Sequence, residues 1–191
     1  GTSDLAEFAK SPNVNIVAMC DVDDRQAVQS RKNFPKANYY KDFREMLAKE
    51  KNNIDACSIS TPDHTHAVAT LAAMQLGKHV YTQKPLTHDI YEARILTQAA
   101  EKYKVVTQMG NQGHASEGSR LTNEWIQAGV IGDVREVHVW SDRAGRLWKQ
   151  GIGRPTDTPA VPATLDWNLW LGPIRERPYH PRRGGRVRAE R

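Results

Sequence analysis

GKHVYTQKPL, residues 77–86, is the stretch that decides the fold of this chain. The short apolar run from His79 to Thr82 predicts a strand, and Gly77 is typical of the end of a preceding helix. A helical pattern follows from about Ile90. A strand between two helices indicates a parallel sheet, so Lys84 lies at the carboxyl end of a strand, where open α/β sheets bind their ligands.

Strand and helix patterns alternate on both sides of this stretch. Further strands are expected at residues 14–20, 38–40, 54–59 and 105–109, and helices at 2–9, 24–34, 43–47, 66–76, 91–103 and 121–128. The first and third of these strands are almost wholly apolar, as in strands buried on both faces. We therefore predict an α/β protein with a Rossmann-type, doubly wound parallel sheet.

The pattern changes near Gly132. Residues 134–140 (VREVHVW) alternate between apolar and polar, which predicts a half-buried strand of an open, largely antiparallel sheet. We expect residues 1–132 to form the domain with the parallel sheet, residues 133–181 to begin an α+β domain, and residues 182–191 to be a basic tail. The Trp-rich stretch in the second domain is expected to be structural.

The amino-terminal end of the chain does not show the complete pattern of such a domain. A doubly wound nucleotide-binding fold starts with a strand, a glycine-rich turn and a helix. Residues 2–9 are expected to be that helix, and Gly1 the last glycine of the turn. The first domain is therefore expected to be incomplete at its amino terminus.

Composition argues against several classes of protein. The 191 residues include no apolar run long enough for a transmembrane helix. The last ten residues hold five Arg and one Glu, so they carry +4 of the net charge of +5, and a nearly neutral body argues against a nucleic-acid binder. Cys20 and Cys57 lie among apolar neighbours and are expected to be small core residues, not a disulfide or a zinc site.

Polar side chains follow the predicted strands. Lys84 is a candidate acid or base, although a solvated loop lysine is the alternative. Asp21 ends the strand at 14–20 and lies 20 residues after Gly1, a spacing at which a carboxylate binds the adenosine ribose in dinucleotide folds. A plain turn residue is the alternative here.

Two further loops occupy the same ends of the strands. In STPDHTH, residues 60–66, Asp63 or Thr65 is expected to cap the next helix, and the loop is expected to line a pocket. Its two histidines have no third ligand at a matching spacing, so no metal site is predicted. MGNQGH, residues 109–114, supplies glycines and polar groups for a hydroxylated ligand, and a plain loop explains it equally well.

Taken together, these stretches resemble the Gfo/Idh/MocA family, named for glucose–fructose oxidoreductase and inositol dehydrogenase. The resemblance runs from about Gly1 to Pro181 and is carried by residues 20–23, 60–66, 77–86 and 110–112, with the Trp-rich residues 166–179 similar to one branch of bacterial members. It implies an NAD(P)-binding Rossmann domain and a carboxyl-terminal α/β domain that often mediates oligomers.

The resemblance also implies a reaction and its residues. NAD, or NADP, would exchange a hydride with a hydroxyl-bearing carbon of a sugar, inositol or related polyol, and Lys84 would be the catalytic residue of the family's Glu-Lys-Pro motif. Asp21 is expected to favour NAD over NADP. The residues implied in cofactor binding are Asp21, Ser60, Thr61, Pro62, His64, His66, Gln83, Lys84, Pro85, Asn111 and Gln112.

The chain departs from the family in two further places. Gln83 stands where the family commonly has Glu, and residues 182–191 do not resemble the family where acid–base residues of the second domain should follow. The chain alone is therefore expected to be a poorly soluble, inactive piece of an enzyme. The alternatives are an NAD-dependent glycosidase that uses transient oxidation, and a non-catalytic dinucleotide-binding regulator, which would have no need of Lys84.

Partners and location follow from the same resemblance. We expect a small-molecule substrate and a homo-oligomer at full length, with neither nucleic acid nor a membrane as partner. The expected location is the cytoplasm, with export of the parent protein left open because Gly1 is not an initiator methionine.

Overall fold

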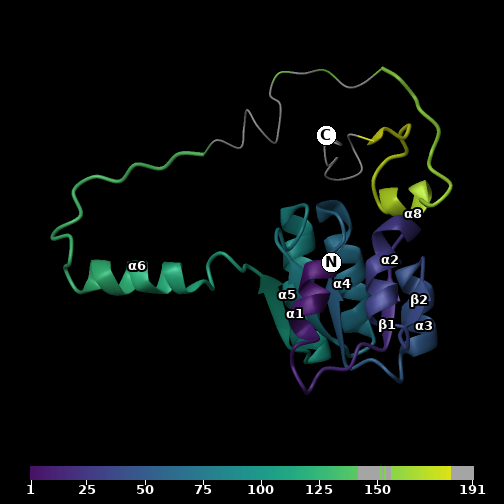
Figure 1. Ribbon diagram of the computed structural model, residues 1–191, viewed down its shortest axis with the longest axis horizontal. Coiled ribbons are helices and arrows are strands. Elements are labelled where there is room, and N and C mark those ends of the chain that lie inside the picture. The colour runs from purple at the N-terminus through teal and green to yellow at the C-terminus, as the bar shows by residue number, and fades with distance from the viewer. Residues whose placement is uncertain (142–150, 152, 154–155, 182–191) are drawn as a thin grey trace. The chain divides into compact units, whose positions relative to one another are not determined.

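The computed structural model describes residues 1–141, 151, 153 and 156–181. The chain divides into two compact units (Figure 1). The first unit is Gly1–Gly110 with the described part of Pro159–Arg191, and the second is the described part of Asn111–Thr158.

From its amino terminus to Gly110, the first unit alternates helices and strands, as the sequence predicts, whereas the helix at Trp167–Leu171 was not predicted. Its elements are α1 (Thr2–Phe8), β1 (Ala18–Cys20), α2 (Asp24–Asn33), β2 (Asn38–Tyr40), α3 (Phe43–Glu50), β3 (Ala56–Ile59), the 3₁₀ turn η1 (Asp63–Thr65), α4 (His66–Gln75), β4 (His79–Gln83), α5 (Ile90–Tyr103), β5 (Thr107–Gly110) and α8 (Trp167–Leu171). Aspartates cap four of the helices, because their carboxylates accept hydrogen bonds from the free backbone N–H groups of the first turn. The capping residues are Asp23 for α2, Asp42 for α3, Asp89 for α5 and Asp166 for α8.

All strand pairs in the first unit are parallel. The strands β3, β4 and β5 form one sheet in that order, and β1 pairs with β2 in another. Parallel strands joined through helices are the Rossmann-type arrangement, which confirms the predicted fold class. Because the strands run in one direction, the loops that follow them gather at one edge of each sheet.

The apolar core lies between the sheet of β3, β4 and β5 and its helices. Met74 of α4, Val80 of β4 and Leu96 of α5 are at most 5% exposed and belong to one apolar cluster. Burying side chains of this size stabilises the fold by about 1.5–3 kcal/mol each. Cys57 packs against the same cluster, and burial raises the pKa of its free thiol to about 11.

Two local expectations were wrong. The strand predicted at residues 14–20 is regular only over Ala18–Cys20, because its partner β2 is three residues long. Thr65 does not cap α4 with its side chain, and neither does Asp63. The intervening turn η1 instead brings the Thr65 hydroxyl to the carbonyl of Pro62, to which it donates at 2.9 Å.

The second unit contains the helix α6 (Glu117–Gln127), capped by Ser116, whose hydroxyl accepts from the Ser119 N–H. The strand predicted at 134–140 is wrong for this structure, since those residues have no regular backbone pairing. A strand needs a neighbour for its backbone N–H and C=O groups, and no described residue supplies one to this segment. Val139 and Trp140 are consequently 90% and 85% exposed.

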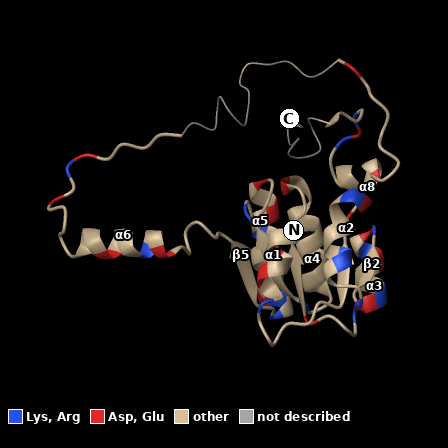
Figure 2. Ribbon diagram, viewed as in Figure 1, with Lys and Arg blue, Asp and Glu red and all other residues tan. Residues whose placement is uncertain are grey.

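Charges of both signs are mixed on the surface of the first unit. Figure 2 shows Lys and Arg beside Asp and Glu along α2 and α3. On α3, for example, Lys49 pairs with Glu45 at 2.7 Å. Among the described residues, no helix is both long and apolar enough to cross a membrane.

Candidate active site

The residues singled out from the sequence follow the carboxyl ends of the strands. Asp21 follows β1, residues 60–66 follow β3, Gln83 ends β4 and is followed by Lys84 and Pro85, and Asn111 and Gln112 follow β5. The last two belong to the second unit, whereas the others belong to the first.

Asp21 lies at the turn from β1 into α2. Its carboxylate accepts a hydrogen bond from the Asp23 N–H at 2.9 Å, and its carbonyl accepts one from the Tyr39 hydroxyl at 2.8 Å. Burial raises the pKa of the Asp21 carboxyl, and the negative charges of Asp23 and Asp24 raise it further, against the hydrogen bond from Asp23. A carboxylate at this position can accept hydrogen bonds from the two hydroxyls of a ribose.

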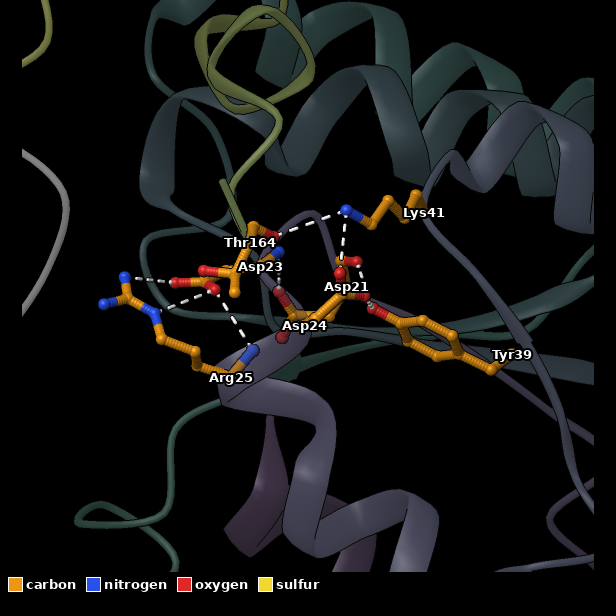
Figure 3. Close-up of polar contacts among 7 residues, drawn as sticks. All are labelled: Asp21, Asp23, Asp24, Arg25, Tyr39, Lys41 and Thr164. Carbon is orange, nitrogen blue, oxygen red and sulfur yellow. Dashed lines mark hydrogen bonds and ion pairs between the residues drawn. The ribbon is translucent and has the colours of Figure 1, made fainter. Parts of the chain in front are cut away.

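The side chains of Arg25 and Lys41, near Asp21, form ion pairs with other carboxylates (Figure 3). The Arg25 guanidinium pairs with Asp23 at 2.9 Å, and the Lys41 ammonium pairs with Asp24 at 2.9 Å. A phosphate on a ribose would have to compete with these carboxylates for either cation. The surroundings of Asp21 therefore suit a ribose with free hydroxyls better than a phosphorylated one.

The carboxyl-terminal segment, residues 159–181, contacts this same turn. The Asp24 N–H donates to the Thr164 carbonyl at 3.1 Å, and the Asp166 N–H donates to the Val22 carbonyl at 2.9 Å. Between them, Asp23 and Leu165 form an isolated antiparallel bridge. Sequence analysis missed these contacts, because they join residues about 140 positions apart through backbone groups that carry no sequence signal.

The carboxyl-terminal segment also reaches the loop after β3. The Trp170 carbonyl lies 2.8 Å from Nε2 of His64, and the two rings are 4.8 Å apart. Trp170 also stacks on Trp167, with ring centroids 4.6 Å apart. The two tryptophans thus pack on each other, and His64 joins them to the loop after β3.

His66 joins the loops after β3 and β4. Its ring is 1% exposed, with Nε2 2.8 Å from the Thr61 carbonyl and Nδ1 2.6 Å from the Pro85 carbonyl. Both ring nitrogens are therefore engaged within the protein. The contact fixes the spacing between the loop at residues 60–66 and the Lys84–Pro85 turn.

Lys84 is exposed at the end of β4, and its backbone N–H donates to Oε1 of Gln83 at 3.2 Å. The other end of that amide donates to Asp4 of α1, at 2.9 Å. Asp4 also accepts from the Ser60 hydroxyl at 2.7 Å. Sequence analysis missed Asp4, although an acidic residue in the first turn of the helix after Gly1 was a visible signal.

Comparison with known proteins gives similarities to a family model and to curated relatives. A family model described as an oxidoreductase family with an NAD-binding Rossmann fold, GFO_IDH_MocA, matches residues 1–111. The chain is 31% identical over 137 residues to 1-carboxy-3-chloro-3,4-dihydroxycyclo hexa-1,5-diene dehydrogenase of Comamonas testosteroni, covering 70% of this chain and 33% of that protein. It is 30% identical over 146 residues to glycosyl hydrolase family 109 protein 1 of a Shewanella species, covering 70% of this chain and 31% of that protein.

The fold is similar to that of a solved dehydrogenase. The crystal structure of myo-inositol 2-dehydrogenase from Lactobacillus plantarum matches with a TM-score of 0.62 and 26% identity, covering 70% of this chain and 41% of that one. The chain spans about a third of the length of the curated relatives above.

Proposed function

The chain belongs to the Gfo/Idh/MocA oxidoreductase family and contains its NAD-binding Rossmann domain, and on this premise we propose that the whole protein oxidises or reduces a hydroxyl group of a sugar, inositol or related polyol. One observation carries the proposal. On an NAD-binding fold, Lys84 lies at the carboxyl end of β4, the edge at which such folds bind their ligands.

We assign Asp21 to the adenosine ribose of NAD. Its carboxylate would accept hydrogen bonds from the ribose hydroxyls and would repel the 2′-phosphate of NADP. Ser60, Thr61 and Pro62 would line the cofactor site together with Gln83, Lys84 and Pro85. His64 and His66 would shape this site through the carbonyls that they contact, and not through NAD itself.

Lys84 would move the proton of the reaction. Bound NAD supplies the group that accepts or returns the hydride. In the oxidising direction, the neutral amine of Lys84 takes the proton of the substrate hydroxyl while the carbon loses its hydride. In the reducing direction, the Lys84 ammonium returns this proton to the carbonyl oxygen. The lysine is thus a general base and a general acid at one position.

The experiment is a cofactor assay on the whole protein. Incubation with NAD and a panel of sugars, inositols and polyols should produce NADH with at least one of them. The same panel, with the protein left out, is the control. If no member of the panel changes the redox state of NAD or NADH in either direction, the proposed reaction is wrong.

One comparison favours a second candidate. The similarity to a glycosyl hydrolase family 109 protein supports cleavage of a glycosidic bond, with NAD restored at the end of each turnover. A chromogenic glycoside separates the two reactions, because a glycosidase would release the chromophore without net formation of NADH. A regulatory dinucleotide-binding protein would bind NAD and give neither signal.

A further inference from the structure

We propose that Asp4 and Gln83 form a carboxylate–amide pair that positions Lys84. This inference rests on the proposed role of Lys84. Asp4 is 9% exposed and comes from α1, whereas Gln83 ends β4, so the pair joins two elements that are 79 positions apart. Neither side chain would touch the reacting atoms, and both would act through the backbone of Lys84.

The chemistry of the pair fixes the orientation of the Gln83 amide. An ionised carboxylate can only accept hydrogen bonds, so the NH₂ group of Gln83 must face Asp4. The amide oxygen then faces the opposite way, where it accepts from the Lys84 N–H at 3.2 Å. Asp4 thereby determines which atom of Gln83 is presented to the lysine.

The charge on Asp4 is maintained by its neighbours. Burial alone would raise the pKa of the Asp4 carboxyl. Hydrogen bonds from Ser60 and Gln83 act against burial, and the pKa lies below its usual value. A neutral donor at position 83 suits this carboxylate, whereas a glutamate there would place a second negative charge against it.

The end of β5 leaves room for the pair. A Cβ atom on Gly110 would lie 2.9 Å from Cδ of Gln83 and 2.8 Å from the hydroxyl of Tyr81. Any larger residue at this position would displace the Gln83 amide. Glycine at this position therefore leaves the Gln83 amide undisturbed.

The test exchanges the hydrogen-bond donor at position 83 and the acceptor at position 4. Gln83→Glu places a second carboxylate against that of Asp4. We expect this variant to lower kcat in the whole protein by roughly 10- to 100-fold, the effect of a small misplacement of a catalytic group. Adding Asp4→Asn to this variant places an amide at position 4, which can donate to the new carboxylate at position 83 while its oxygen accepts from Ser60. This double variant should recover most of the lost kcat.

Two controls separate position from charge and from folding. Asp4→Asn alone removes the charge but keeps an oxygen that can accept from Gln83, so it should lose less kcat than Gln83→Glu. Each variant should keep a cooperative thermal transition, so that its kcat reports on a folded protein. Should Gln83→Glu fail to fold, Gln83→Met removes the hydrogen bonds without adding charge and should show the same loss of kcat.

A second measurement needs no turnover. Hydrogen exchange at the Lys84 amide should be several-fold faster in Gln83→Glu than in the unmutated protein and slow again in the double variant. If Lys84→Met abolishes turnover but Gln83→Glu leaves both kcat and this exchange rate unchanged, the positioning inference is overturned and the role of Lys84 stands. A double variant no better than Gln83→Glu would overturn it as well.

Discussion

At the residue scale, Asp21 should determine the choice of cofactor. Replacing it with Ala removes the acceptor for the ribose hydroxyls, and we expect NAD affinity to fall by roughly 10- to 100-fold, the weight of a hydrogen bond to a charged group. Affinity for NADP should fall less. Calorimetric titration with both cofactors checks this, with Asp55→Ala, an exposed aspartate just before β3, as the control. Tighter binding of NADP than of NAD by the unmutated protein would contradict the assignment.

Because the pKa of Asp21 is raised, we expect the affinity for NAD to depend on pH. Burial and the neighbouring carboxylates favour the protonated form, so Asp21 takes up its proton at a higher pH than an ordinary aspartate. A protonated carboxyl accepts hydroxyl hydrogen bonds poorly. NAD affinity should therefore decrease as the pH falls through this raised pKa, and the decrease should be absent in Asp21→Asn. An unmutated protein with constant NAD affinity down to the ordinary aspartate range would contradict this.

At the element scale, the ionisation of Asp23, which caps α2, should make the stability of the fold depend on pH. Burial opposes its ionisation, but hydrogen bonds from the side chain and backbone of Arg25 lower its pKa overall. Its stabilising contribution is therefore complete above the unfolded-state pKa and is lost as the pH falls through the lower, folded-state pKa.

Two substitutions at Asp23 should separate the contribution of helix capping to stability from the contribution of its negative charge. Asp23→Ala should lower the free energy of unfolding by about 1 kcal/mol, the usual weight of an N-cap. Asp23→Asn keeps a capping oxygen and should lose less, while the acid-side dependence becomes weaker. Urea unfolding at neutral and acidic pH measures both effects, with Asp89→Asn at the exposed start of α5 as the control. Equal acid dependence in Asp23→Asn and the unmutated protein would disprove the linkage.

The elements of the first unit from α1 to β5 could be predicted because their signals are local, whereas α8 was not predicted. Asn38–Tyr40 was predicted with its correct bounds, and Gly77, with φ of +71°, ends α4 as its residue type indicates. The predicted ends of the strands were less accurate, because a strand extends only as far as the neighbouring strand with which it pairs. The predicted strand at 134–140 shows this most clearly, since its alternating pattern finds no partner among the described residues.

The candidate site was predictable in its positions but not in its contacts. Lys84 and Asp21 follow strands, and this could be inferred from the chain alone. The engagement of His66 with Pro85, and of Gln83 with Asp4, depends on how distant segments meet. Such polar contacts have no periodicity in the sequence, so only the folded chain brings them together.

At the scale of the whole molecule, the second unit exposes many large apolar side chains. Val137 and Val139 are 74% and 90% exposed, and exposed apolar surface of this kind favours association. We expect the 191-residue chain alone to self-associate, and the double substitution Val137→Lys and Val139→Lys to reduce this association. Sedimentation velocity measures the change. Val28→Lys, at a single exposed valine of α2, should have no effect, and an equal effect there would refute the assignment.

The central claim is that Lys84 transfers a proton while NAD exchanges a hydride with the substrate. Lys84→Met in the whole protein tests it, measured as kcat for NADH formation together with the dissociation constant for NAD. The control is Lys36→Met, at an exposed lysine between α2 and β2. We predict that Lys84→Met lowers kcat by roughly 100-fold or more, the weight of general acid–base catalysis, with NAD affinity nearly unchanged. A kcat within a few-fold of the control would show that Lys84 is a solvated loop residue and would contradict the proposed mechanism.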